Sequence, residues 1–403
     1  MCRCRAFQIN LFKEVKMLKS FGFRTPEWIL FGVDAVSRLG IEAKRLGAGR
    51  VMIITDQGVA KAGLVDRITD PLKKEGIDFA VFDQVEPEPP IHNLLDSVKM
   101  AREGKFDVFV GLGGGSSMDT TKLTSAMMTN KGDIQDFFGV DNVPKRGLPT
   151  IMITTTSGTG SEVTRMAVFT DTDANLKKVV SAQNILADVA IVDPSMTTSM
   201  PPGVTASTGI DAFIHAVESY INSRNANPFT DAIALESIGL IAKSLGPAYA
   251  NGRHDIEARY NMALGSVTAG IALNNAGVGH VHALAYPIGA EYHLAHGIAL
   301  IVVNEECMRS VAMSNLPKFR KIAEIMGINV SGFSQWEAAE AAIEGMTALA
   351  KSVNLPTTLT DVGGDKSKIQ EWAEAAYGER RLLGNTPRDL TVDDIVAIFT
   401  KSF

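Results

Sequence analysis

The strongest constraint on the fold is a regular alternation of short apolar runs and helical stretches in the first half of the 403-residue chain. Residues 50–55 are apolar and β-branched, and a helical pattern over residues 59–75 follows them. Further runs of strand length lie at 79–82, 108–111, 151–154 and 189–192, with a second helical pattern at 94–103. Strands that alternate with helices are typical of a parallel sheet with crossover helices. The first half is therefore predicted to be an α/β domain.

The pattern changes after Pro201 and Pro202. Long helical patterns then dominate, at residues 210–223, 228–244, 256–271 and 335–352. Two domains agree with the length of the chain, since a domain has roughly 100–200 residues. We expect residues 17–200 to form the α/β domain and residues 201–403 to form an all-helical domain. Residues 1–16 are basic and lack an apolar core, so they are expected to be a disordered extension rather than a secretion signal.

Composition excludes several classes of protein. The chain has 39 Lys and Arg against 45 Asp and Glu, a net charge of −6, which argues against nucleic acid and anionic membranes as partners. No apolar run approaches the roughly 20 residues that a membrane-spanning helix requires. Three cysteines are too few for a disulfide framework, so a reducing, cytoplasmic location is expected. Composition therefore excludes these classes of protein but does not indicate which reaction the protein catalyses.

A glycine-rich turn joins the third predicted strand to a helix, in the segment 108–119. Gly113, Gly114 and Gly115 lack Cβ atoms, so the backbone there can adopt positive φ and approach a pyrophosphate closely. Ser116 is placed to cap the following helix, whose N-terminal N–H groups and dipole favour an anion. The spacing is not the G-x-G-x-x-G fingerprint, and a tight turn without a ligand is the alternative. Consecutive glycines favour the phosphate site, because they are a costly way to make a turn.

Two further segments support a dinucleotide. Residues 154–161 follow a predicted strand and offer flexible glycines and several hydroxyl groups, with Thr155, Thr156 and Thr159 as candidate cofactor contacts. Asp56 follows the first strong strand, where a carboxylate commonly accepts hydrogen bonds from ribose hydroxyls. A carboxylate there would repel a 2′-phosphate, so NAD is predicted in preference to NADP. The alternative for Asp56 is a helix N-cap.

Acidic and imidazole groups with the spacing of metal ligands lie in the helical half. Asp211 and His215 are four residues apart on a predicted helix and therefore share one face. Four of the chain's seven histidines then follow within a short stretch, namely His280, His282, His293 and His296. One carboxylate with two or three neutral imidazoles suits a divalent first-row ion, Fe(II) or Zn(II), with a coordination position left open. Any single one of these histidines could instead be a buried structural residue.

Separate motifs thus occur in a fixed order: the glycine turn with Asp119, the segments 155–162 and 209–215, and His282 with His296. With these motifs the chain resembles the iron-containing alcohol dehydrogenases from about Phe21 to its end. Its ending, residues 384–396, is similar to that of the propanediol oxidoreductases among them. The resemblance implies a Rossmann-like N-terminal domain and an all-helical C-terminal domain, in an architecture like that of dehydroquinate synthase. It also implies a metal in the cleft between the domains, and a homodimer or larger homo-oligomer.

The resemblance assigns roles residue by residue. The family's metal ligands fall here on Asp211, His215, His282 and His296. Its cofactor contacts fall on Asp56, Gly114, Gly115, Ser116, Asp119, Thr155, Thr159 and Lys178. The activity that this implies is hydride transfer between NAD(H) and a small primary alcohol, aldehyde or diol, with Fe(II) or Zn(II) bound.

One position near the expected metal departs from the family pattern. Many relatives have a second histidine four residues after the ligand, a proposed proton relay or substrate contact, and here that residue is Tyr286. Ala295 likewise stands where relatives usually have proline. We therefore expect an intact metal site in an altered pocket. Tyr286, His280 and His293 are the candidates for relaying the proton between substrate and solvent.

Three other functions remain open. Glycerol dehydrogenase-like oxidation of vicinal diols would use the same site. A lyase of the dehydroquinate synthase type would need a basic cleft for an anionic substrate, and the helical half has few clustered basic residues, mainly Arg309 and residues 318–321. A scaffold that binds metal or nucleotide without turnover is the non-enzymatic alternative, which steady-state NADH consumption would exclude.

Overall fold

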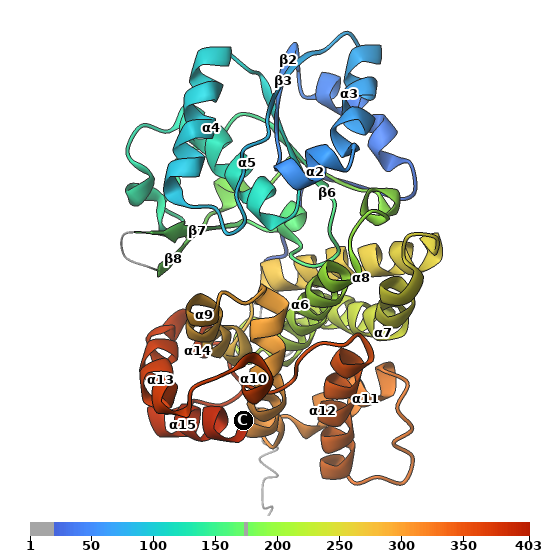
Figure 1. Cartoon of the computed structure of the whole chain (residues 1–403), viewed down its shortest axis with the longest axis vertical. Helices are drawn as coiled ribbons and strands as arrows, with labels where there is room; N and C mark the ends of the chain where they lie inside the picture. Colours follow the sequence, from blue (N-terminus) through green and yellow to red (C-terminus); the bar gives the residue numbers. More distant parts are fainter. Residues whose placement is uncertain (1–19, 173–175) are drawn as a thin grey trace, which may run out of the picture.

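The computed structural model describes residues 20–172 and 176–403, so the extension predicted at residues 1–16 lies outside the described residues. Two bodies are stacked along the long axis of the molecule (Figure 1). One contains the strands with their helices, and the other contains helices α6 to α15. The predicted fold class, a parallel α/β domain followed by an all-helical domain, is confirmed.

A six-stranded parallel sheet forms the centre of the first body. Its strand order is β1-β9-β6-β4-β2-β3, with bounds Trp28–Phe31, Val189–Val192, Thr150–Thr154, Val108–Gly113, Arg50–Ile54 and Asp78–Phe82. Val110 of β4 pairs with Ile53 of β2 on one side and with Ile151 of β6 on the other. Five of these strands match the predicted apolar runs, whereas β1 is an additional edge strand that pairs with β9.

Both faces of this sheet are buried, which explains why its central strands are apolar at successive positions. On β2, Val51 and Ile53 pack into the core on one face, and Met52 and Ile54 pack into the core on the other. The covering helices are α1 (Leu39–Arg45) and α3 (Leu64–Lys74) on the first face, and α4 (Ile91–Gly104) and α5 (Gly115–Thr129) on the second (Figure 1).

The single helix predicted over residues 59–75 is two helices, which corrects that prediction. Helix α2 spans Gln57–Lys61 and α3 spans Leu64–Lys74. Gly63 between them has a φ of 74°. A residue with positive φ cannot continue a right-handed helix, so the chain turns at Gly63 before α3 begins.

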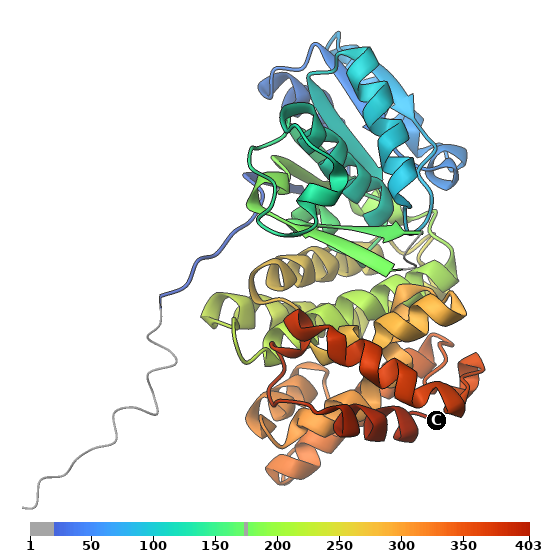
Figure 2. The ribbon, with the colours of Figure 1, turned by 90° about the vertical axis from the view of Figure 1, so that its left-hand side faces the viewer.

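A small second sheet, which the sequence patterns do not predict, lies between the two bodies (Figure 2). Strands β7 (Met166–Asp171) and β8 (Leu176–Ser181) pair antiparallel, and β5 (Gly139–Val140) joins β8. Alternate residues of the hairpin point to opposite faces. Ala167 and Val180 pack into a core with residues of α4 and α5. Val168 and Val179 line a cleft on the other face.

Helix α6 (Pro202–Ile221) lies at the centre of the helical body. It contacts α7 (Pro228–Asn251), α8 (Ile256–Ala276) and α10 (His296–Ala312), and from Thr205 onward nearly all of its residues are buried. Further helices are α9 (His280–Tyr292), α11 (Leu316–Ile325), α12 (Gln335–Ser352), α13 (Ile369–Gly378), α14 (Arg380–Leu383) and α15 (Val392–Lys401). Each helix predicted in this half overlaps an observed one, and α12 has the predicted bounds. No helix in the described part of the chain is long and apolar enough to cross a membrane.

Gly297 sets how closely α10 approaches α6. A Cβ atom at this position would lie 1.9 Å from the carbonyl oxygen of Ser207, which belongs to the backbone of α6. Gly297 directly follows His296, so this close contact also determines where the imidazole of His296 lies. The absence of a side chain at residue 297 is therefore a condition for bringing the two helices together.

We expect Gly297→Ala to destabilise the protein by about 1–3 kcal/mol, because α10 must move away from α6 to admit the methyl group. The free energy of unfolding, measured by urea denaturation of metal-free protein, tests this. Gly203→Ala is the matched control, since a Cβ atom there would meet nothing within 4 Å. Its free energy of unfolding should change by less than about 1 kcal/mol. A Gly297→Ala variant as stable as this control would contradict the packing argument.

Candidate functional site

A cleft of about 270 Å³ lies between the two bodies and is lined by both. The first body contributes the start of α5, through Gly115 and Ser116, and the inner face of the β7–β8 hairpin. The helical body contributes residues of α6, α9, α10 and α14, among them Asp211, His215, His282, Tyr286, His296 and Arg381. The glycine-rich turn and the histidine cluster, which lie far apart in the sequence, therefore share one cleft.

Asp211 and His215 reach the cleft from the buried helix α6. They lie one turn apart, and Oδ1 of Asp211 is 3.3 Å from Nε2 of His215. Both side chains are buried, and Oδ1 of Asp211 has no hydrogen-bond partner in the described structure. A buried carboxylate oxygen without a donor is unfavourable, so this position favours a cation.

His282 reaches the same point from the first turn of α9. Its ring stacks on that of His215, with centroids 5.0 Å apart and an interplanar angle of 17°. Its Nε2 is buried without a partner, while its Nδ1 lies 2.5 Å from Oε2 of Glu218. One potential ligand atom from each of Asp211, His215 and His282 lies within 4.8 Å of the others. Three side chains from two helices thus converge.

His296, the first residue of α10, completes the group on its open side. Its Nε2 is 3.8 Å from Oδ1 of Asp211, and its ring centroid is 5.2 Å from that of His282. Its side chain is 35% exposed, against 7% or less for Asp211 and His215. Three of the four residues expected to be metal ligands thus have ligand atoms within 4.8 Å of one another, and His296 lies next to them on the side that faces the cleft.

This donor set fits a divalent first-row ion. Burial lowers the pKa of His282 and of His296, which keeps both imidazoles neutral, the form that binds a metal. Imidazole and carboxylate groups are ligands that suit Fe(II) or Zn(II). The unpartnered Oδ1 of Asp211 and Nε2 of His282 are the kind of buried atoms that such an ion would satisfy.

Glu218 is a residue of this site that the sequence analysis missed. Its Oε1 accepts a hydrogen bond from the backbone N–H of Val281 at 2.8 Å, and its Oε2 contacts Nδ1 of His282. The signal that could have found it is the spacing of Asp211, His215 and Glu218, which follow one another at i, i+4 and i+7. Residues with that spacing share one face of a helix.

The three candidates for a proton relay lie in different places. Tyr286 lines the cleft with its ring centroid 6.2 Å from that of His296, and burial raises its pKa to about 12. His280 is buried and does not line the cleft, and its Nε2 lies 3.0 Å from the carbonyl oxygen of Cys307. His293 is exposed at the end of α9 with a φ of 49°. Of the three, the structure brings Tyr286 alone to the cleft.

The glycine-rich turn lies on the opposite wall of the cleft. Gly113 has a φ of 146°, and a Cβ atom there would lie 2.6 Å from Oγ of Ser117, so this position requires glycine. Gly114 is the N-cap of α5 and Gly115 its first residue. The expectation that Ser116 caps this helix is therefore corrected: the helix begins one residue before Ser116, and no side chain caps it. The N–H groups of its first turn remain available to an anion.

The predicted threonine contacts lie beside this turn. The backbone N–H of Thr155 donates to the carbonyl oxygen of Gly113 at 3.0 Å and holds the two segments together. Oγ1 of Thr156 is buried without a partner, and it would lie 3.6 Å from a Cβ atom at Gly114. Thr159 lines the cleft next to Gly115. The structure thus brings the two predicted cofactor segments together.

Asp56 has the capping role that the sequence left open as its alternative. It is the N-cap of α2, and its Oδ1 accepts a hydrogen bond from the backbone N–H of Val59 at 2.9 Å. Its Oδ2 lies beside the glycine turn, 3.4 Å from Oγ of Ser117. One oxygen of this half-buried carboxylate is therefore used for the cap, and the other faces the turn.

Asp119 lines the cleft but is already engaged. Its Oδ1 accepts a hydrogen bond from Oγ of Ser161 at 2.6 Å, and its Oδ2 accepts one from the backbone N–H of Val168 at 2.9 Å. The carboxylate of Asp119 therefore links α5 to β7 and to the segment that contains Ser161. This contact helps to position the hairpin wall of the cleft.

Lys178 was expected to contact the cofactor, but its side chain points away from the cleft. Its Nζ lies 3.2 Å from Oδ2 of Asp171 and 5.4 Å from the ring centroid of Phe138. Its neighbour Lys177 lines the cleft instead. Successive residues of a strand face opposite sides, so an error of one residue moves a side chain to the other face.

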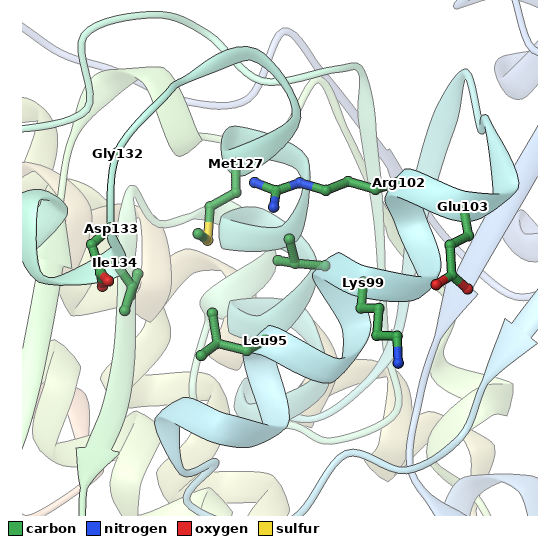
Figure 3. A pocket seen from close by; sticks show the side chains of 9 residues that line it. Leu95, Lys99, Arg102, Glu103, Met127, Gly132, Asp133 and Ile134 are labelled. Carbon is green, nitrogen blue, oxygen red and sulfur yellow. The ribbon is translucent and has the colours of Figure 1, made fainter.

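A second hollow, of about 470 Å³, lies between α4 and the chain around the end of α5 (Figure 3). Leu95, Lys99 and Arg102 of α4 line it, together with Met127 and Ile134. None of the site residues predicted from the sequence lies there. The predicted chemistry is therefore concentrated in the cleft between the two bodies.

The chain is similar to known proteins along nearly its whole length. Residues 26–194 match the family model of iron-containing alcohol dehydrogenases, and residues 205–403 match that of the C-terminal part of the Fe-containing alcohol dehydrogenase family. Long-chain-alcohol dehydrogenase 1 of Geobacillus thermodenitrificans is 43% identical over 375 residues, which cover 92% of this chain and 94% of that protein.

Solved structures show the same likeness. The structure of a 1,3-propanediol oxidoreductase has a TM-score of 0.93 at 37% identity, covering 96% of this chain and 100% of the other. NADH-dependent butanol dehydrogenase A from Thermotoga maritima has a TM-score of 0.84 at 27% identity, covering 96% and 99%. The chain belongs to the iron-containing alcohol dehydrogenase family.

Proposed function

We propose that the chain transfers a hydride between NAD(H) and a small primary alcohol, aldehyde or diol, in a reaction that requires a divalent ion, Fe(II) in preference to Zn(II). Family membership makes it an oxidoreductase of the alcohol dehydrogenase type. One observation carries the rest of the proposal. Two buried, unpartnered ligand atoms, Oδ1 of Asp211 and Nε2 of His282, belong to the cleft that also contains the start of α5.

Asp211, His215, His282 and His296 would hold the ion. Bound there, it would supply a Lewis acid that lowers the pKa of an alcohol hydroxyl. The carboxylate of Asp211 offsets part of the positive charge, and the burial of Asp211 and His215 keeps water away from one side. His296, which is partly exposed, lies on the side from which a substrate would approach.

The opposite wall would hold the dinucleotide. The uncapped first turn of α5 offers N–H groups and the positive end of a helix dipole to a pyrophosphate. Thr156 and Thr159 offer hydroxyl groups beside it. Oδ2 of Asp56, which lies beside the glycine turn, would accept a hydrogen bond from a ribose hydroxyl, and its charge would disfavour a 2′-phosphate, which supports NAD over NADP. When bound, the nicotinamide would supply or accept the hydride.

The walls between these two sites favour an aliphatic substrate over an anionic one. Met166, Val168 and Val179 line the cleft from the hairpin, and Leu273 and Val278 line it from the helical body. Nζ of Lys177 lies 2.8 Å from Oε1 of Glu88, so these two residues form an ion pair. Arg381 also lines the cleft and has no ion pair in the described structure. A lyase that acts on an anionic sugar derivative would need a cluster of such groups. Each of the relatives named above has an aliphatic alcohol in its name, which supports an aliphatic substrate.

His282→Ala is expected to abolish metal retention and turnover together, because it removes a buried ligand atom. Turnover should fall by more than roughly a thousandfold, since an ion of this kind stabilises a transition state by several kcal/mol. The protein is purified without oxygen and loaded with Fe(II) or Zn(II), and bound metal and NADH consumption with short aldehydes are measured. His92→Ala, whose side chain is 65% exposed outside the cleft, is the control and should leave both unchanged. Full activity of His282→Ala would rule out the ligand assignment.

Asp56→Asn separates the two roles of Asp56. Asparagine is as good an N-cap as aspartate, so α2 should keep its cap, while the negative charge next to the glycine turn is lost. We expect the ratio of kcat/KM with NADPH to kcat/KM with NADH to rise about tenfold, which corresponds to a repulsion of about 1.4 kcal/mol. Steady-state kinetics with both cofactors measures the ratio, and an unchanged thermal midpoint shows that the cap is retained. A ratio equal to that of the wild type would contradict a cofactor role for this carboxylate.

Tyr286 would act in the cleft as a neutral hydroxyl. Burial raises its pKa to about 12, so at neutral pH it keeps its proton and can donate a hydrogen bond to a substrate oxygen, but it cannot act as a base. Tyr286→Phe is expected to lower kcat by about a hundred- to a thousandfold, as the loss of one donor to a developing charge does. The shape of the pH–rate profile between about pH 6 and 9 should not change, because no ionising group is lost in that range.

His293→Ala, which alters an exposed side chain outside the cleft, is the control for this variant and should retain the wild-type kcat. A shifted pH–rate profile in Tyr286→Phe would show that the phenol ionises during turnover, against the neutral role assigned to it.

A further inference from the structure

Glu218 lies beside the four proposed ligands without being one of them. Its side chain is 1% exposed, and it contacts His282 through Oε2 and the backbone of Val281 through Oε1. We propose that Glu218 is a positioning residue: it holds His282 in the tautomer that presents a bare Nε2, and so determines how tightly the site binds a divalent ion. The inference rests on the metal-dependent function proposed above.

The contact with Glu218 determines which nitrogen of His282 carries the proton. An ionised carboxylate can only accept hydrogen bonds, so the proton in the 2.5 Å contact belongs to Nδ1 of His282. A neutral imidazole has one N–H, and Nε2 therefore keeps its lone pair. Nε2 is the buried atom without a partner, in the group that includes Asp211 and His215. A proton on Nε2 would remove the lone pair that a metal needs.

The same carboxylate caps α9 from another helix. No side chain of the adjoining chain caps the start of α9 at Gly279, whereas Glu218 accepts the N–H of Val281, the second residue of α9. The N-terminal end of the α9 dipole favours a negative charge at this place. One carboxylate thus joins the helix of Asp211 and His215 to the helix of His282.

If Glu218 only capped α9, the variant Glu218→Gln would give a different result than if Glu218 also set the tautomer of His282. Glutamine has nearly the same shape, and its amide oxygen can still accept the N–H of Val281. Its amide nitrogen then faces Nδ1 of His282 and donates to it, so the imidazole proton moves to Nε2. In the opposite orientation, the amide N–H of the glutamine would face the backbone N–H of Val281. Both groups are donors, so a buried donor would be left unsatisfied. The favoured orientation preserves the cap and blocks the ligand atom.

The test is a titration of metal-free, full-length protein with Co(II), followed by the visible absorption of the bound ion. Glu218→Gln should bind Co(II) about ten- to a hundredfold more weakly than the wild type, as is typical when a partner of a ligating histidine is changed. The thermal midpoint of its metal-free form should stay close to that of the wild type. Glu42→Gln is the matched control, since Glu42 is also buried but lies on α1, outside the cleft. It should bind Co(II) as the wild type does.

Equal affinity of Glu218→Gln and the wild type for Co(II) would overturn the inference. A loss of affinity accompanied by an equivalent loss of stability in the metal-free form would also overturn it, because a cap alone predicts that result. Nitrogen-15 NMR of histidine-labelled, metal-free wild type gives a second measurement that needs no variant to fold. His282 should carry its proton on Nδ1, and a proton on Nε2 would overturn the inference. A wild type that binds no Co(II) would instead overturn the metal-dependent function.

Discussion

The contact between Glu218 of α6 and the first turn of α9 joins the helix of Asp211 and His215 to the helix of His282. Helix α6 is buried nearly all round, so a polar residue on it must find its partner inside the protein. Glu218 finds the N-terminus of α9 and the imidazole of His282. Asp211 and His215, on the same face, then meet that imidazole. His296 is added through α10, which approaches α6 closely because residue 297 is glycine.

The other wall of the cleft depends on backbone geometry more than on charge. The turn before α5 needs the positive φ of Gly113, and α5 begins without a side-chain cap. The β7–β8 hairpin closes the space between this turn and the helical body, with one face in a core and the other in the cleft. The two bodies also touch at Gly270 and Gly160, where a Cβ atom on Gly270 would lie 2.7 Å from the Cα atom of Gly160. The two bodies therefore pack backbone to backbone at this point.

Much of this could be predicted from the sequence where the pattern is local. The strands of the large sheet are apolar on both faces, and Asp211 and His215 share a face by their spacing alone. The rest depends on contacts between distant segments. The partner of Glu218 lies on another helix, more than sixty residues along the chain. Which of Lys177 and Lys178 lines the cleft depends on the register of the β7–β8 hairpin, which no sequence pattern predicted. Which of Tyr286, His280 and His293 meets the cleft depends on how α9 packs against α6 and α10.

The central claim is that one divalent ion binds at the point where Asp211, His215, His282 and His296 converge. Crystallographic anomalous scattering, recorded at the iron absorption edge from protein loaded with Fe(II) without oxygen, tests it most directly. We predict a single anomalous peak at a coordination distance of roughly 2.0–2.3 Å from Oδ1 of Asp211 and the Nε2 atoms of the three histidines. A map without a peak at this point, or with its main peak elsewhere in the protein, would contradict the claim.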